Sequence, residues 1–148
     1  MVPSSNMAER LRYWLPFGAA FLVLFMGLFV SERLLLYDRF AGFDKLMHIA
    51  GGLVAVWLLD YVFYEEIKHL APLKILLLLA AGACLVGVFW EFAEFGANFT
   101  RQSAPWLYHW FHGGNLNDTI GDLASDLLGA MLFAVPLAVR HRSNKQIE

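Results

Sequence analysis

The stretch NLNDTIGDLASDLLGA, residues 115–130, determines how the rest of this chain is interpreted. Asp118, Asp122 and Asp126 recur at every fourth residue, which places all three carboxylates on one side of an α-helix. The residues around them are apolar enough for the segment to enter a bilayer. A charged side chain at mid-bilayer costs at least about 2.5 to 3.5 kcal/mol on insertion scales. The sequence therefore raises one physical question: what neutralises three acids on a membrane helix?

The composition is that of a membrane protein. Of the 148 residues, 59% are hydrophobic and only 16% are charged, a smaller charged share than soluble domains carry. A formal net charge of -2 gives no basic surface of the kind that binds nucleic acid, so no nucleic-acid partner is expected. The single cysteine, Cys84, excludes an internal disulfide.

Four segments are long and apolar enough to cross a bilayer as helices. A crossing needs about 20 mainly apolar residues at a rise of about 1.5 Å each. The loop sequence APWLYHWFHGG, residues 104–114, carries Trp106 and Trp110 one helical turn apart, which predicts a short helix in the membrane interface. We therefore expect a single all-α transmembrane domain over residues 1–148, a polytopic bundle with this short interfacial helix in the outer loop. Its four transmembrane helices are predicted at about residues 14–35, 45–64, 73–95 and 118–139.

Lysine and arginine residues predict the orientation, because they are enriched in cytoplasmic segments beside the spans. Seven flank one membrane face: Arg10, Arg12, Lys68, Lys74, Arg140, Arg142 and Lys145. Four flank the other: Arg33, Arg39, Lys45 and Arg101. Both termini are therefore expected in the cytoplasm of a bacterial inner membrane, and the connections 31–44 and 96–117 are expected to face outward.

The ionisable residues of the spans gather near that outer face. They open the second span, close the third and open the fourth: Asp44, Lys45, His48, Glu91, Glu94, Asp118, Asp122 and Asp126. On the third span, Ala83 and Gly87 share one helix face with Glu91. Stripes of small residues allow membrane helices to approach closely, so this face should meet the other helices. The acids are therefore predicted to point into the bundle.

These acids need compensation by protonation, by a cationic side chain or by a metal ion. Lys45 and Arg101 are the only permanent cations expected within reach. A divalent cation balances the excess better, since carboxylates suit Mg²⁺ or Mn²⁺ and an added imidazole admits Zn²⁺ or iron. The candidate metal ligands are His48, Glu91, Glu94, Asp118, Asp122 and Asp126.

Simpler roles are available for some of these residues. Thr119-x-x-Asp122 has the pattern of a capping box, and Asp118 is itself a possible cap of the fourth span. Glu94 could equally lie in headgroup water. Asp126 lies roughly 12 Å beyond Asp118 along the helix, where capping cannot reach. Asp126 is therefore the most informative of the three aspartates.

Three stretches together resemble a known group of bacterial membrane proteins. They are GFDKLMHIAGG at residues 42–52, WEFAE at 90–94 and GGNLNDTIGDLASDLLGA at 113–130. In their order and membrane placement they resemble the YjdF-type family of bacterial inner-membrane proteins and the broader VanZ-like group. The family's polar positions fall here on Asp44, His48, Glu91, Glu94, Asp118, Thr119 and Asp122. The chain departs from the pattern by its short length of four spans and by the additional Asp126.

Two functions are compatible with such an outward-facing acidic and histidine site. The first is a metal-dependent hydrolase or transferase acting on a membrane lipid or lipid-linked cell-envelope substrate. Its candidate catalytic residues are Asp44, His48, Glu91 and Asp122. The second is non-enzymatic: the resemblance implies ligand docking of the kind linked to glycopeptide (teicoplanin) resistance in VanZ-like proteins, while intramembrane acids also suit a proton or cation relay. The cluster could also serve only to fix helix packing.

Overall fold

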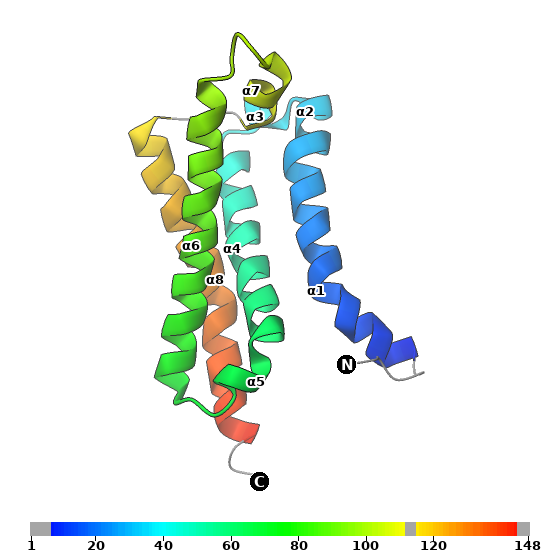
Figure 1. Cartoon of the computed structure of the whole chain (residues 1–148), viewed down its shortest axis with the longest axis vertical. Helices are drawn as coiled ribbons and strands as arrows, with labels where there is room; N and C mark the ends of the chain where they lie inside the picture. The colour runs from blue at the N-terminus through cyan, green and yellow to red at the C-terminus, as the bar shows by residue number, and fades with distance from the viewer. Residues whose placement is uncertain (1–6, 112–114, 145–148) are drawn as a thin grey trace.

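The computed structural model of the chain describes residues 7–111 and 115–144, and this described part contains helices and no strand (Figure 1). The all-α prediction is confirmed. In chain order the elements are α1 (Met7–Phe25), the π-helical turn η1 (Met26–Val30), α2 (Ser31–Leu34), α3 (Leu36–Arg39), α4 (Phe43–Val62), α5 (Tyr64–Ile67), α6 (Pro72–Asn98), α7 (Pro105–Phe111) and α8 (Leu116–Asn144).

Within the described residues, four helical stretches are long and apolar enough to cross a membrane. They are Trp14–Leu34, Phe43–Val62, Pro72–Asn98 and Leu116–Arg142, close to the four predicted spans. The first stretch is made of α1, η1 and α2 in succession, and its backbone turns at Leu35, a non-glycine residue with φ of 53°. The four-span bundle predicted from the sequence is confirmed.

Helices α4, α6 and α8 pack against one another, and α1 packs beside α4 (Figure 1). The chain enters α1 and leaves α8 at the same end of the bundle, as an even number of spans requires. At the opposite end, here named the α7 end, lie α2, α3 and α7. The short helix α7 is where the sequence predicts one, and its placement in a membrane interface stays a prediction.

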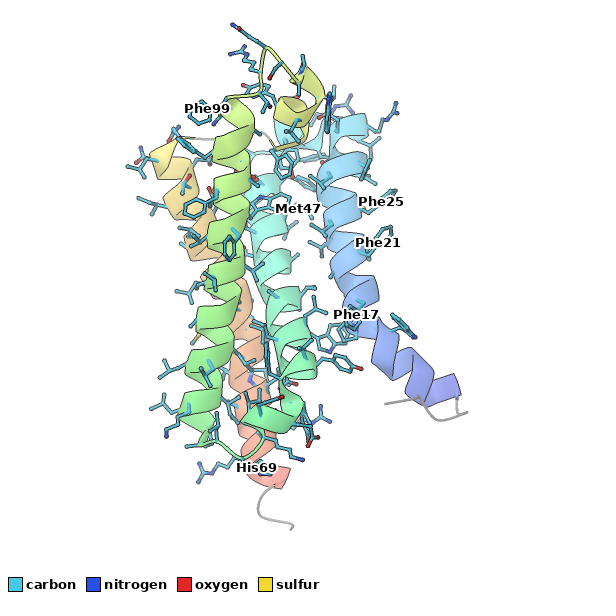
Figure 2. All side chains as sticks on the ribbon, viewed as in Figure 1. Phe17, Phe21, Phe25, Met47, His69 and Phe99 are labelled. Atoms are coloured by element: carbon cyan, nitrogen blue, oxygen red, sulfur yellow. The ribbon has the colours of Figure 1, made fainter. Side chains whose placement is uncertain are left out.

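The outer surface of the bundle carries large apolar side chains. Phe21 and Phe25 point away from the bundle in Figure 2, and Phe21 is 68% exposed. Such a surface is unfavourable in water and suits contact with lipid. The buried interior contains small residues instead, including Ala83, Ala130 and Ala134, so the helices approach each other closely.

Glycines set the closest approaches between the helices. A Cβ atom added to Gly52 on α4 would collide with the backbone carbonyl of Asp126 on α8, and one added to Gly129 would collide with the carbonyl of Ile49. A Cβ atom on Gly51, the neighbour of Gly52, would lie 3.8 Å from Asp126 Oδ1, an ordinary contact. Gly52 and Gly129 therefore fix the height at which Asp126 faces α4.

We predict that Gly52→Ala lowers the free energy of unfolding by about 1–3 kcal/mol, because the two backbones must separate. Thermal unfolding of the purified protein in detergent measures this loss. Gly51→Ala is the matched control, since it adds the same methyl group one residue away without a collision. Equal losses in the two variants would contradict the close approach described here.

Candidate functional site

The ammonium group of Lys45 lies at the centre of a charged group near the α7 end. Its Nζ donates hydrogen bonds to Asp44 Oδ2 at 3.1 Å, to Asp118 Oδ1 at 2.5 Å and to Asp122 Oδ1 at 2.7 Å. We name these four residues the acid–lysine cluster. The carboxylates come from α4 and α8, so Lys45 neutralises negative charge that two helices bring together. Asp122 is buried, whereas the Asp118 side chain is 39% exposed.

His48 lies one helical turn deeper than Asp44 and joins this cluster to Asp126. Its Nε2 is 3.4 Å from Asp122 Oδ1 and 3.8 Å from Asp44 Oδ1. Its Nδ1 lies 3.3 Å from Asp126 Oδ1 on the other side of the ring. The imidazole is buried, so the surrounding carboxylates hold it in a fixed orientation between two acidic positions.

Part of the predicted metal-ligand set lies close enough to hold one ion. Asp44, His48 and Asp122 each offer a ligand atom, and these atoms all lie within 4.8 Å of one another. The sequence analysis assigned Asp44 to catalysis and not to metal binding, yet its carboxylate lies in this group. Carboxylate and imidazole ligands together are typical of Zn²⁺, Mn²⁺ and iron sites.

Glu91 approaches the same region from α6. The side chain is buried, and its Oε1 has no hydrogen-bond partner among the described residues. It lies within electrostatic range of His48 and Asp126, and its carboxyl contacts the hydroxyl of Thr119. A buried oxygen without a partner is costly, so Glu91 Oε1 can still accept a hydrogen bond.

Glu94 occupies a different position from the other predicted ligands. Its Oε1 accepts a hydrogen bond of 2.6 Å from Nε1 of Trp90, and the Trp90 ring contacts Phe111 of α7. Glu94 is 9% exposed, so it is buried rather than immersed in headgroup water. The structure thus places Glu94 near Glu91 but outside the group of three donors.

The capping explanation for the aspartates does not hold. Helix α8 begins at Leu116, and the side chain of Asn115 accepts hydrogen bonds from the backbone N–H groups of Asn117 at 2.9 Å and Asp118 at 3.3 Å. Thr119 lies inside the helix, where it cannot act as its cap. Asn115 therefore caps the helix, which leaves Asp118 and Asp122 for the contacts with Lys45.

Tyr37 of α3 is a site residue that the sequence analysis missed. Its hydroxyl donates a 3.2 Å hydrogen bond to the carbonyl of Gly27, which also accepts one from Ser31. Burial raises the pKa of Tyr37 to about 12, and the negative charge of Asp44 adds to that rise. The phenol is therefore neutral at physiological pH and borders the acids from the α1 side. A lone tyrosine in a predicted loop gave no sequence signal for this.

Beside His48 lies a cavity of about 400 Å³ with almost entirely apolar walls. We name it the apolar cavity. Residues of α1, η1, α4 and α6 line it, and the polar side chains of His48 and Asp126 form part of its wall; representative lining residues are Ala20, Leu24, Met47, Leu58, Val86 and Trp90. In Figure 2, Met47 lies between α4 and α1. The sequence analysis missed this cavity because its small residues have the spacing of ordinary helix packing.

A second polar pair lies at the other end of the bundle. His141 Nε2 is 2.8 Å from Asp60 Oδ1, and the His141 ring lies 5.3 Å from that of Tyr64. Buried apolar residues, including Val56 and Ala134, lie between this pair and His48. The part of the chain that the structure describes therefore shows two polar regions separated by an apolar core.

We predict that Lys45→Met lowers the free energy of unfolding by about 1–3 kcal/mol, because it leaves Asp122 buried without its cationic partner. Added Mn²⁺ or Zn²⁺ should restore part of the loss, since an ion that binds only the folded state stabilises it. Thermal unfolding with and without metal measures both effects.

Lys68→Met is the matched control for this variant. The ammonium of Lys68 pairs with an exposed carboxylate, that of Glu65, at 2.6 Å. Exposed ion pairs contribute roughly 0–1 kcal/mol, so this variant should change little and should not respond to metal. An Lys45→Met protein as stable as the parent would show that the acids do not depend on Lys45.

Comparison with known proteins gives one match. Residues 6–143 match the family described as "predicted membrane protein (DUF2238)", and because the match covers nearly the whole chain, the chain belongs to this family. No curated protein and no solved structure matches the chain. The family description agrees with the membrane-spanning bundle.

Proposed function

We propose that this member of the DUF2238 family is a metal-dependent membrane hydrolase or transferase that acts on a lipid or lipid-linked substrate of the cell envelope. The position of His48 carries the proposal. One ring nitrogen faces Asp44 and Asp122, while the other faces Asp126 at the wall of the apolar cavity. A polar site and a hydrocarbon-compatible cavity thus share one residue, as an enzyme acting on a lipid requires.

Asp44, His48 and Asp122 are the residues that would hold the ion. Their donor atoms are close together, and they provide the mixed carboxylate and imidazole ligands that divalent cations accept. Lys45 now bonds to two of the three, so its ammonium would have to move toward Asp118 when a cation binds. A bound Zn²⁺, Mn²⁺ or Mg²⁺ would supply an acidified water molecule at neutral pH.

The surrounding side chains have roles suited to such chemistry. Glu91, with its unpaired Oε1, is placed to accept a proton as general base. Once a bound ion takes Asp44 and Asp122 from Lys45, the ammonium, whose side chain is 34% exposed near the α7 end, can pair with an anionic headgroup. While His48 Nε2 would bind the ion, its Nδ1 faces Asp126 Oδ1, so Asp126 can hold the imidazole in the orientation that binding requires. These assignments make Asp44, His48 and Asp122 the ligands of the ion and Glu91 the general base.

The proposal includes the membrane in which the protein lies and its orientation there. We place the α7 end at the outer face of the bacterial inner membrane and both termini in the cytoplasm, which the excess of basic residues beside the termini supports. The resemblance of three stretches to YjdF-type and VanZ-like proteins supports an envelope role. The acid–lysine cluster then lies at headgroup depth, where a lipid-linked substrate presents its polar part.

A non-enzymatic docking site is the second candidate, and one observation favours it. Lys45 already pairs with Asp44, Asp118 and Asp122, so the cluster can be stable without a metal and could receive an envelope ligand instead. A transmembrane proton or cation relay is less compatible with the structure, because apolar residues separate His48 from the Asp60–His141 pair. Metal binding distinguishes the enzyme from the docking site.

We predict that the purified protein, loaded with Mn²⁺ or Zn²⁺ and freed of excess ion, retains about one ion per chain, since ligand atoms of three residues converge. Elemental analysis by mass spectrometry measures the content. Asp122→Asn and His48→Gln should each lower metal affinity by at least about tenfold, because each removes a ligand.

Asp60→Asn is the control, as Asp60 lies in the polar pair at the opposite end of the bundle. Its metal content should equal that of the parent protein. Failure to retain any stoichiometric divalent ion under loading with Mg²⁺, Mn²⁺ or Zn²⁺ would defeat the enzyme proposal and leave the docking site.

A further inference from the structure

We infer that the apolar cavity binds one hydrocarbon chain ending in a hydrogen-bond donor, and that Asp126 Oδ2 accepts the hydrogen bond from that donor. The inference rests on the proposed function in one respect: it identifies the hydrocarbon part of the proposed substrate. Binding of the chain itself requires no metal.

The cavity has the composition that a hydrocarbon chain requires. Its wall extends from Gly27 and Met47 near the α7 end to Leu58 and Leu59 in the other half of the bundle. Water is poorly accommodated along such a wall, because few polar partners are present. A flexible hydrocarbon chain fills the space without any unsatisfied polar group.

The carboxylate of Asp126 determines which end group the bound hydrocarbon chain should carry. The residue is 5% exposed, its Oδ1 faces His48, and its Oδ2 has no hydrogen-bond partner among the described residues. Asp126 also lines the cavity, and its Oδ2 lies against Gly87, another residue of the cavity wall. Because this oxygen is enclosed by its neighbours, binding of a donor requires a small shift of the wall beside it. A buried carboxylate oxygen without a partner is unfavourable, so a ligand that donates a hydrogen bond gains affinity there.

The chemistry of Asp126 also excludes some lipids from this position. A fatty acid or a phosphate group would place a second negative charge beside the carboxylate, which is repulsive in a low-dielectric interior. A plain alkane would fill the cavity but leave Oδ2 unpaired. A hydroxyl or amino group donates the required hydrogen bond, so a long-chain alcohol or amine fits best.

Helix α1 forms one wall of the cavity. In the Trp14–Leu34 span, to which α1 belongs, only 11% of the apolar window is buried, compared with 28% for the α4 and α6 spans and 39% for the α8 span. It packs against α4 and contributes Ala20, Val23 and Leu24 to the cavity. A lipid in the surrounding bilayer can therefore reach the cavity by displacing one weakly packed helix, without passing through the acid–lysine cluster.

The test uses the full-length protein in detergent micelles with a chelator and a photoactivatable long-chain alcohol. Mass spectrometry then locates the labelled residues. We expect labelling on the α1 and α4 residues that line the cavity. Unlabelled hexadecanol or hexadecylamine should compete for this labelling, and which of the two competes better identifies the end group. Palmitate and hexadecane should compete at least about tenfold less well, equivalent to 1.4 kcal/mol.

Ala20→Phe fills the cavity from α1 without replacing a polar residue, and it should lower labelling about tenfold or more. The matched control is Ala81→Phe, which adds the same ring at an exposed position on α6 outside the cavity. Asp126→Leu should remove the preference for hexadecanol over hexadecane.

Unchanged labelling in Ala20→Phe, or equal competition by hexadecane and hexadecanol in the parent protein, would overturn the inference. These outcomes are separate from those of the metal experiment. Labelling that behaves as expected in a protein that retains no metal would support the binding site while refuting the enzyme. Metal retention without labelling in the cavity would support metal binding and refute the hydrocarbon-binding site.

Discussion

The structure depends on the neutralisation of carboxylates that three membrane helices bring to one place. Asp44 on α4, Glu91 on α6 and Asp122 on α8 are all partly or wholly buried near the α7 end. Ionised acids in such an environment repel one another and lose hydration, so the bundle is stable only if positive charge or shared protons offset them. Lys45 and His48 provide that compensation within the chain.

Some of these carboxylates are paired with a positive charge, whereas others keep an oxygen without a hydrogen-bond partner. This difference points to function. Lys45 satisfies the acids nearest the α7 end, where a third of its side chain is exposed. Deeper in the bundle, one oxygen of Glu91 and one of Asp126 have no partner among the described residues, although both side chains are buried. Structures that serve packing alone rarely leave such groups unsatisfied. Glu91 lies in electrostatic range of His48, whereas Asp126 is one of the residues that line the apolar cavity.

Much of this arrangement could be predicted from the sequence, because spans and helix faces depend on the hydropathy and spacing of residues that are close together in the chain. Long apolar runs indicated the four spans, and the interval of four residues placed Asp118, Asp122 and Asp126 on one helix face. The convergence of α4, α6 and α8 followed from the alternating direction of the helices. The stripes of small residues correctly indicated close packing, as the collisions at Gly52 and Gly129 confirm.

Other features depend on the three-dimensional path of the chain and left no local pattern. Tyr37 borders the acids only because the chain turns at Leu35, and the cavity exists only because α1 packs loosely beside α4. Asn115 competes successfully with Thr119 as helix cap, although both residue types are suited to that role. The different hydrogen bonding of Glu91 and Glu94 likewise depends on which of the two acids Trp90 reaches.

The most direct test of the central claim is anomalous diffraction from crystals of the purified protein soaked in Mn²⁺ or Zn²⁺. The account predicts one anomalous peak within bonding distance of His48 Nε2 and of carboxylate oxygens of Asp44 and Asp122, with the Lys45 ammonium displaced toward Asp118. Well-ordered soaked crystals in which Lys45 still bonds to Asp44 and Asp122, with no anomalous peak beside His48, would contradict it.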